Sequence, residues 1–375
     1  MKNVNYLYEQ NKGNYKLTHL QGKNLFYNSN AETFNFNELK KLINFFAEAE
    51  NKYRNANIRY VIQYNKDIIF DDKLSIVLLE CLFYHLIINM HRNIKLNANI
   101  KKSITSELFG YSCIWKMSNV EEFVKNFKFD IYEGHFRRLA CVESLKSNPQ
   151  ELSVIMGDIQ SFLTNCGIEK SKSCMISEIS SELMDNALEH SESDCLIDID
   201  VTKNPYIKDG NLNKLYFGVN IVVVDFSNKI LGEDIGLLLS NSEIKGEQYT
   251  KLENFNTLHK SFFNEDYKQE QFYMLSSFQN KITGRSEKSL TGGKGLTKLI
   301  EGLQKSAEAY NCYVVSNGTI INFIKEFIKQ DEEKWVGFNI NNDFKFPPDK
   351  ISINKSPLNI FGTAYNLNFV FEKGE

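Results

Sequence analysis

Hydrophobic residues in the first part of the chain follow two different spacings. Apolar positions three and four residues apart predict helices over 35–53 and 71–91, and the β-branched and aromatic run 58–64 between them predicts a strand. Shorter strand and helix patterns follow at 108–115 and 120–127. This alternation predicts an α/β fold for the N-terminal part.

The rest of the chain begins with two amphipathic stretches and then becomes rich in strand patterns. Neighbouring strand patterns lie close together in sequence, which favours antiparallel pairing. We therefore predict an α/β sandwich in which a mixed, mostly antiparallel sheet is covered by helices on one face. The predicted helices are 150–167, 171–191 and 291–307, and the predicted strands are 195–202, 214–226, 312–316, 319–325, 334–340 and 362–371.

Polar, turn-forming residues divide the chain into two predicted domains. The first proline is Pro149, in the polar stretch SLKSNPQEL, and a new helical pattern begins directly after it. We predict a smaller N-terminal α/β domain over 1–146, with a regulatory or interaction role, and a C-terminal domain over 147–375. A long charged stretch over about 227–291 lies inside the second domain.

Composition and charge exclude several classes of protein. Of the 375 residues, 42% are hydrophobic and 24% are charged, and a net charge of −3 gives no reason to favour nucleic acid as a partner. The most apolar stretch, 75–90, is too short to span a membrane and contains Glu80. The N-terminus lacks the apolar run of a signal peptide, and the seven cysteines are scattered. These features predict a cytoplasmic protein with reduced thiols and no membrane contact.

The stretch SELMDNALEHSES (181–193) places three polar side chains on one stripe of a predicted helix. Glu182, Asn186 and His190 are four residues apart, and each such step turns a helix by only about 40°. The neighbouring stripe, which would face the core, consists of Ile179, Leu183 and Ala187. Polar stripes beside a core are usually solvated, so this helix alone does not identify a site.

Three further features follow in a definite order along the chain. Asp225 ends the apolar strand NIVVVD, at the position where sheets of α/β proteins place ligand contacts. A glycine-rich turn then precedes an amphipathic helix, and its free N–H groups suit phosphate oxygens. The last strand begins with Gly362 and Thr363. The residues of the glycine-rich turn and helix start are Gly292, Gly293, Lys294, Gly295 and Leu296.

This order of motifs resembles the GHKL superfamily of ATP-binding domains, which includes gyrase-type, chaperone-type and mismatch-repair ATPases, histidine kinases and anti-sigma-factor kinases. The resemblance covers roughly 150–375, and SELMDNALEHS is most similar to the first motif of the histidine and anti-sigma kinases. It implies a Bergerat-type α/β sandwich that binds ATP and Mg²⁺. The short strand and long apolar helix over 58–90 are weakly similar to STAS-like regulatory domains.

The resemblance also implies roles for single residues. Glu182 would be the general base for the attacking water or hydroxyl, and Asn186 would give an amide oxygen to Mg²⁺. Asp225 would accept a hydrogen bond from the adenine amino group, with Thr363 beside it. His190 either approaches a phosphate or caps its helix. The phosphates would lie against Gly292, Gly293, Lys294, Gly295 and Leu296.

The chain departs from the family pattern after the strand aspartate. Ser227 stands at the first glycine position of the usual D-x-G-x-G motif, which puts the path of that loop beside the adenine in doubt. The interval 227–291 is long, charged and poor in glycine, so we predict a lid with helices of its own. Lids of this kind commonly move when nucleotide binds.

The residues leave the biochemical class open. One hypothesis is a slow Mg²⁺-dependent ATPase that acts as a switch and couples its nucleotide state to a protein partner, through the N-terminal domain or the lid, in bacterial signalling or antiphage defence. The alternative is a protein kinase acting on a separate protein. A histidine kinase is disfavoured, because no histidine lies between His135 and His190 and we interpret His135 as packed or solvated. A binding-only scaffold and a homodimer also remain open.

Overall fold

The structure is a computed structural model of the whole chain, and it describes most of it. The described residues are 5–16, 20–53, 57–101, 111–190, 192–202, 206–207, 214–240, 246–282, 295–306 and 312–373. Within this part, no helix is both long enough and apolar enough to cross a membrane.

The N-terminal unit, which we define as the described residues up to 128, is built on a small parallel sheet. Its strands lie in the order β1-β2-β4-β6, where β2, β4 and β6 are parallel and β1 is antiparallel to β2. Helices connect the parallel strands, as parallel pairing requires. The strands are β1 (Leu20–Gln21), β2 (Asn24–Ser29), β3 (Thr33–Phe34), β4 (Arg59–Tyr64), β5 (Ile69–Phe70) and β6 (Asn93–Asn97).

The helices of this unit bear out the helical periodicity of its sequence. The predicted helix over 71–91 is an α-helix as far as Tyr84 and continues as one wider π-helical turn, His85–Asn89. The helices are α1 (Asn5–Asn11), α2 (Phe36–Tyr53), α3 (Lys73–Tyr84) and α5 (Val120–Lys128), with a short 3₁₀ helix at Cys113–Lys116.

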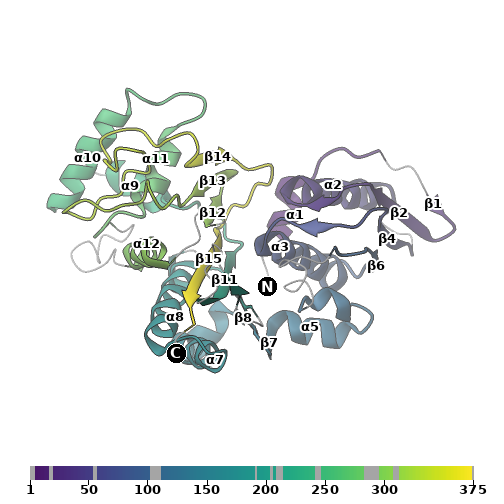
Figure 1. The fold of residues 1–375 in the computed structure, drawn as a ribbon. Coiled ribbons are helices and arrows are strands. Elements are labelled where there is room, and N and C mark those ends of the chain that lie inside the picture. The colour runs from purple at the N-terminus through teal and green to yellow at the C-terminus, as the bar shows by residue number, and fades with distance from the viewer. Residues whose placement is uncertain are drawn as a thin grey trace.

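The C-terminal part is organised around a nine-stranded antiparallel sheet, which we call the large sheet (Figure 1). Its strands lie in the order β14-β13-β12-β15-β11-β9-β8-β7, and β10 pairs with β11. The predicted α/β sandwich is therefore confirmed. The strands are β7 (Phe129–Tyr132), β8 (His135–Ala140), β9 (Cys195–Val201), β10 (Tyr206–Ile207), β11 (Leu215–Asp225), β12 (Tyr313–Ser316), β13 (Thr319–Asn322), β14 (Ile353–Lys355) and β15 (Ala364–Glu372).

Two of these strands come from residues that we assigned to the N-terminal domain. Strand β8 pairs with β9 from Ala140↔Cys195 to His135↔Asp200, and β7 pairs with β8 at the edge of the sheet. The large sheet therefore extends across the boundary that we predicted between 146 and 147, and it begins at Phe129. Strand pairing between segments so distant in sequence leaves no local pattern.

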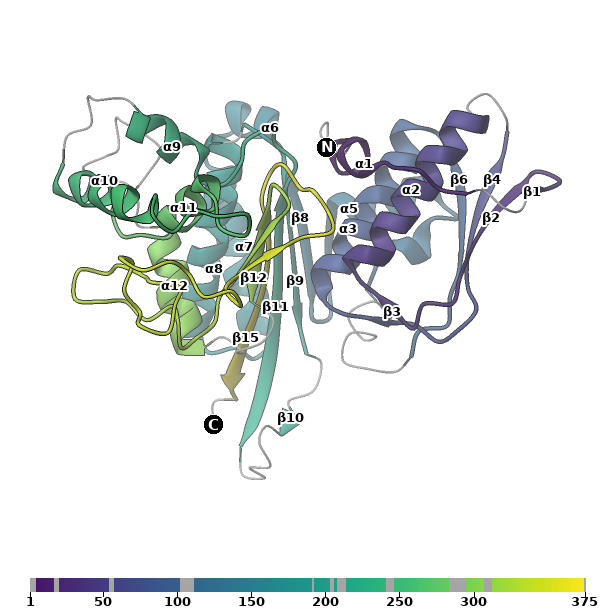
Figure 2. The ribbon, with the colours of Figure 1, turned by 90° about the horizontal axis from the view of Figure 1, so that it is seen from above.

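Helices cover both faces of the large sheet (Figure 2). The predicted layer consists of α7, α8 and α12, which share an apolar core with the sheet. The other face is covered by the N-terminal unit, because α3 packs against β11 and β15 and shares a second apolar cluster with them. The helices of the C-terminal part are α6 (Val142–Ser147), α7 (Glu151–Asn165), α8 (Lys170–Asp185), α9 (Glu233–Ser240), α10 (Glu247–His259), α11 (Gln269–Ser276) and α12 (Gly295–Ser306).

The described part of the predicted lid contains the helices α9, α10 and α11, as we predicted. They pack with the segment 323–350, and the aromatic residues of both regions meet around the buried His259. Its Nε2 lies 2.8 Å from Phe344 O, and its Nδ1 lies 2.6 Å from Tyr267 Oη. The predicted interval as far as 291 extends beyond the described residues.

The strand that we predicted over 334–340 is wrong. Lys334 and Phe338 have φ angles of 66° and 55°, so the backbone turns where a strand would stay extended. Asn339 then holds this segment together, because its side-chain amide donates to carbonyl oxygens that include Gly337 O and Asp343 O. Trp335, Val336 and Phe338 of this stretch are buried in the apolar core, whereas Ile340 is exposed.

Candidate functional site

The strand end that carries Asp225 forms a compact polar site with the start of β15. The backbone N–H of Asp225 donates to Thr363 O at 2.9 Å, and the N–H of Thr363 donates to Asp225 Oδ2 at 3.1 Å. A Cβ atom on Gly362 would lie 2.3 Å from both the backbone oxygen and Oδ1 of Asp225, so only glycine fits there. Thr363, which the resemblance placed beside Asp225, is therefore in direct contact with it, and so is Gly362.

Ser227 has a definite place in this site, at the position where the resemblance leads one to expect a glycine. Its N–H donates to Asp225 Oδ1 at 3.1 Å, and its hydroxyl accepts a hydrogen bond from Lys229 N at 3.2 Å. The side chain is buried. Ser227 thus closes a turn around the carboxylate, as short polar side chains commonly do after a strand.

The Asp225 carboxyl is buried among these donors. Burial raises the pKa of Asp225 to about 6, and the hydrogen bonds from Ser227 and Thr363 oppose that rise. Each carboxylate oxygen has two lone pairs, so acceptor capacity remains beside the two N–H groups. A buried, ionisable acceptor of this kind can select a ligand that offers an N–H donor.

Helix α8 carries Glu182, as the sequence predicted, and Asn186 is the C-cap residue of this helix. The residues of the apolar stripe, Ile179, Leu183 and Ala187, are buried in the core, whereas Glu182 and Asn186 are half-buried. A π-helical turn begins at Asn186 and includes His190, whose side chain lies outside the described part. Such wide turns often occur at functional sites.

Asn186 and Asp225 lie at the same end of the large sheet. The N–H of Ser193 donates to Ala187 O at 3.3 Å, which holds the end of α8 close to the start of β9. The first residue of β9, Cys195, is the direct cross-strand partner of Asp225. The turn that follows α8 therefore begins beside the strand end that carries the buried carboxylate.

Helix α12 runs antiparallel to α8 and brings its N-terminus to this end. Lys298 Nζ lies 3.0 Å from Glu178 Oε2, and a Cβ on Gly302 would lie 2.6 Å from Ile179 Cδ1. The hydrogen bond that Lys298 donates to Glu178 raises the pKa of Lys298, and the charge of Glu182 acts in the same direction. Helix α12 starts at Gly295, so its free N–H groups lie toward Glu182.

Part of the predicted phosphate segment lies outside the described residues. Gly292, Gly293 and Lys294 fall there, so the structure does not describe the glycine-rich turn itself. Of the other two, Gly295 is the first residue of α12, and the Leu296 side chain packs into the apolar core.

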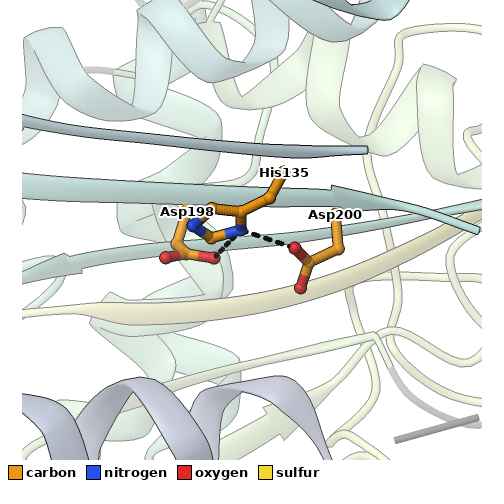
Figure 3. A group of neighbouring side chains, drawn as sticks. All are labelled: His135, Asp198 and Asp200. Carbon is orange, nitrogen blue, oxygen red and sulfur yellow. Dashed lines mark hydrogen bonds and ion pairs between the residues drawn. The ribbon is translucent and has the colours of Figure 1, made fainter. Parts of the chain in front are cut away.

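A second group of polar residues, which the sequence analysis missed, lies on the opposite face of the large sheet. The ammonium of Lys73, the first residue of α3, is ion-paired with both Asp198 and Asp200 of β9. His135 Nδ1 of β8 lies 2.7 Å from Asp200 Oδ1 (Figure 3). All four side chains are buried. This group joins the N-terminal unit to the large sheet.

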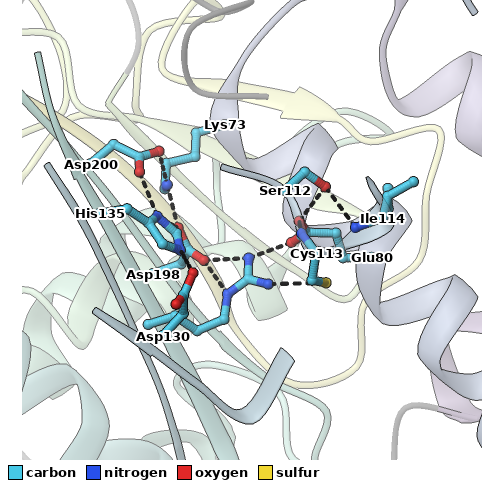
Figure 4. Close-up of polar contacts among 10 residues, drawn as sticks. Lys73, Glu80, Ser112, Cys113, Ile114, Asp130, His135, Asp198 and Asp200 are labelled. Carbon is cyan, nitrogen blue, oxygen red and sulfur yellow. Dashed lines mark hydrogen bonds and ion pairs between the residues drawn. The ribbon is translucent and has the colours of Figure 1, made fainter. Parts of the chain in front are cut away.

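The charge cluster continues along α3 from Lys73 to Glu80 (Figure 4). The Arg137 guanidinium is ion-paired with both Asp198 and Glu80, and Ser112 Oγ donates to Glu80 at 2.6 Å. Burial alone would raise the pKa of Asp198, but Arg137 and Lys73 hold it well below its ordinary value. We call Lys73, Glu80, His135, Arg137, Asp198 and Asp200 the interface charge cluster.

Three members of this cluster offer the donor types of a metal site. Ligand atoms of His135, Asp198 and Asp200 all lie within 4.8 Å of one another. Lys73, however, places its ammonium against both carboxylates. Burial favours its neutral form, but Asp198 and Asp200 outweigh burial and raise the pKa of Lys73 above its ordinary value. The lysine is thus the cation that these aspartates bind in the structure.

The alternation of residues in β9 was the available sequence signal for this cluster. Cys195, Ile197 and Ile199 face the helical layer of α7 and α8, so Asp198 and Asp200 must face the other side. In CLIDIDVT this pattern is typical of a strand with one solvated face. Only the charged residues of the otherwise apolar α3, Lys73 and Glu80, indicated a buried partner.

A groove of about 760 Å³ lies in the N-terminal unit between β6 and the 3₁₀ helix. Its lining includes the cationic side chains of Arg59, Arg92 and Lys95 together with the exposed ring of Trp115. Arg92 is ion-paired with Glu50. The groove shares no residue with the site at Asp225.

Comparisons with known proteins do not place this chain in a family. No family model, no curated protein and no solved structure matches it.

Proposed function

We propose that this chain is a Mg²⁺-dependent ATP-binding protein of GHKL type that hydrolyses ATP slowly and uses its nucleotide state to control a protein partner. The observation that carries the proposal is the contact between Asp225 and the Gly362–Thr363 turn at one end of the large sheet. The same end holds the turn after α8 and faces the N-terminus of α12. Three motifs that are far apart in sequence, together with the start of α12, support one site in this region.

The adenine would be recognised at Asp225. The buried carboxylate accepts hydrogen bonds, and the adenine amino group is a donor where guanine has a carbonyl oxygen. Gly362 supports this role, because its missing side chain leaves the backbone of β15 in close contact with the carboxylate. ATP would therefore be preferred over GTP.

The triphosphate would lie between the end of α8 and the start of α12. The N-terminus of a helix attracts phosphate through its free N–H groups and its dipole. Asn186 and Glu182 are half-buried near the end of α8, and their side-chain oxygen atoms fit the preference of Mg²⁺ for oxygen ligands. A bound Mg²⁺ would neutralise phosphate charge, while Glu182 would hold the attacking water and accept its proton.

The location and the partner are parts of the same proposal. We place the protein in the cytoplasm, supported by seven free cysteines, of which Cys81, Cys113, Cys195 and Cys312 are buried. The N-terminal unit is the proposed partner-binding element, because it packs against one face of the large sheet and contacts β11 and β15, which border the proposed nucleotide site.

The experiment that tests the proposal follows γ-labelled ATP with Mg²⁺ and the purified full chain. We expect wild type to release phosphate, and Glu182→Ala to bind ATP but to hydrolyse it at least about a hundredfold more slowly, the usual effect of losing a general base. Glu178→Ala, one helical turn earlier, is the matched control and should keep most of the activity. Asp225→Asn should lose ATP affinity, because an amide N–H₂ would face a backbone donor.

Other outcomes have definite meanings. Normal ATP binding by Asp225→Asn in calorimetry would overturn the adenine assignment. ATP that is bound but stays intact with wild type would replace the hydrolase by a kinase that awaits its protein substrate, or by a binding-only module.

A further inference from the structure

The loop 356–361 connects the N-terminal unit to the candidate nucleotide site. It runs directly into Gly362 and Thr363, so its position sets the position of the two residues that hold the Asp225 carboxylate. On the sheet side, the N–H of Asn317 donates to Ile360 O at 2.6 Å, and Ser316 Oγ donates to Gly362 O at 2.8 Å. The other side of the loop is held by the N-terminal unit.

Asn11, the last residue of α1, binds this loop through a reciprocal pair of hydrogen bonds. Its side-chain N–H₂ donates to Asn359 O at 2.7 Å, and its Oδ1 accepts from Asn359 N at 2.6 Å. The same amide donates to Leu7 O at 2.8 Å, which fixes its orientation. Asn11 is only 3% exposed, so water does not compete freely for these bonds.

Lys40 of α2 makes a second contact with the loop. Its ammonium donates to Pro357 O at 2.8 Å. Leu358, between these two contacts, and Ile360, directly after them, are buried in the apolar cluster of the N-terminal unit. The loop is therefore packed into the N-terminal unit at one end and continues into the candidate nucleotide site at the other.

We infer that Asn11 and Lys40 are positioning residues for the nucleotide site, through which the N-terminal unit sets the affinity for ATP. The inference rests on the proposed function. Release of the loop lets Gly362 and Thr363 move away from Asp225. The Asp225 carboxylate, which would accept the hydrogen bond from the adenine, then loses its fixed position. A partner that displaces α1 or α2 would change ATP affinity without touching the nucleotide.

The test compares four variants of the full chain by calorimetric titration with Mg²⁺ and ATP. We expect the ATP dissociation constant to rise roughly tenfold in Asn11→Ala, which loses two hydrogen bonds to the loop. In Lys40→Met, which loses one hydrogen bond, it should rise several-fold. Lys40→Arg keeps a donor and should restore wild-type affinity. Lys41→Met is the matched control, because Lys41 is the next residue of α2 and pairs with Glu38 instead; its affinity should stay within about twofold of wild type.

Hydrogen exchange at the amides of Gly362 and Thr363 gives a second readout without nucleotide. Faster exchange in Asn11→Ala and Lys40→Met, but not in Lys41→Met, supports the inference. Unchanged exchange together with unchanged ATP affinity overturns it. If wild type binds no ATP, the proposed function fails, and the exchange measurement alone decides whether the N-terminal unit holds this turn.

Discussion

The two faces of the large sheet differ in chemistry although the same strands form both. Toward α7, α8 and α12 the strand residues that form the core are apolar, and Asp225 lies at the end of one of these strands. Toward the N-terminal unit, an apolar cluster surrounds buried charges from Asp198, Asp200 and Arg137. Strand β9 supplies both kinds of surface, because its alternate residues point to opposite faces.

The difference shows how one sheet can serve two purposes. The apolar face fixes two helices whose ends lie near the candidate site, and apolar packing tolerates many sequences. The charged face fixes one particular partner, because each buried charge requires its counter-charge in place. We therefore interpret the N-terminal unit as a specifically docked layer of the sheet and not as an interchangeable appendage.

The largest expected effect comes from breaking the charged face at Lys73. Lys73→Met leaves Asp198 and Asp200 buried with one cation fewer, and removing one partner of a buried ion pair typically costs about 3–5 kcal/mol. Lys66→Met is the control, because its ion pair with Glu32 is exposed and should change stability by less than about 1 kcal/mol. Urea denaturation of both variants measures the difference. Equal stability of the two would mean that the charges do not hold this face together.

A smaller effect concerns how the free energy of unfolding depends on pH through Asp225, on the face of the sheet toward α7, α8 and α12. The folded pKa of Asp225 is raised from 3.8 to about 6, so the folded state binds more protons than the unfolded state between these values. Its contribution to stability is present below pH 3.8 and is lost as the pH rises through about 6. The loss amounts to roughly 3 kcal/mol, because a tenfold difference in proton affinity between the folded and unfolded states corresponds to about 1.4 kcal/mol.

Asp225→Asn provides the reference for this measurement because asparagine does not titrate. The difference in unfolding free energy between wild type and Asp225→Asn should fall by up to roughly 3 kcal/mol from pH 4 to pH 7. A difference that stays constant over this range would show that the carboxyl is not buried as described. The same ionisation predicts weaker ATP binding below pH 6, where the protonated carboxyl becomes a poorer acceptor.

The smallest expected effect tests the crossing of α8 and α12 on the apolar face. Gly302→Ala places a methyl group 2.6 Å from Ile179 Cδ1, and a shift of that side chain should leave a net loss of about 1 kcal/mol. Gly157→Ala in α7 is the matched control, since no atom lies within 4 Å of its added Cβ. That change should stabilise the protein by about 0.5–1 kcal/mol through helix propensity. Thermal denaturation of the pair distinguishes close packing from a loose crossing.

Periodicity predicted the elements that carry the site but not their assembly. The stripe of Ile179, Leu183 and Ala187 defined the buried face of α8 in advance, and the apolar run before Asp225 defined β11. The contact of Thr363 with Asp225 was expected only through the resemblance to a family. Residue spacing alone does not reveal it, because 138 positions separate the two.

The interface charge cluster and the edge of the large sheet escaped prediction for a physical reason. Asp198 and Asp200 have the alternation of an exposed strand face, and nothing near them in sequence indicates that Lys73 and Arg137 neutralise them. Likewise, the pairing of β8 with β9 joins residues that are about 60 positions apart. Burial of charge is a property of tertiary contact, and local patterns do not record it.

The interface charge cluster also has a consequence for the folding of the nascent chain during translation. The ribosome releases α3 long before β9, so a nascent N-terminal unit can close its small parallel sheet while the outer side of α3 still lacks its cover. Until the strand with Asp198 and Asp200 arrives, Lys73 and the apolar residues around it are exposed to water and to other chains. Strand β9 thus also helps to cover the apolar surface of α3 in the growing chain. A pause in translation after α3 and before β9 would be the time of greatest risk for aggregation.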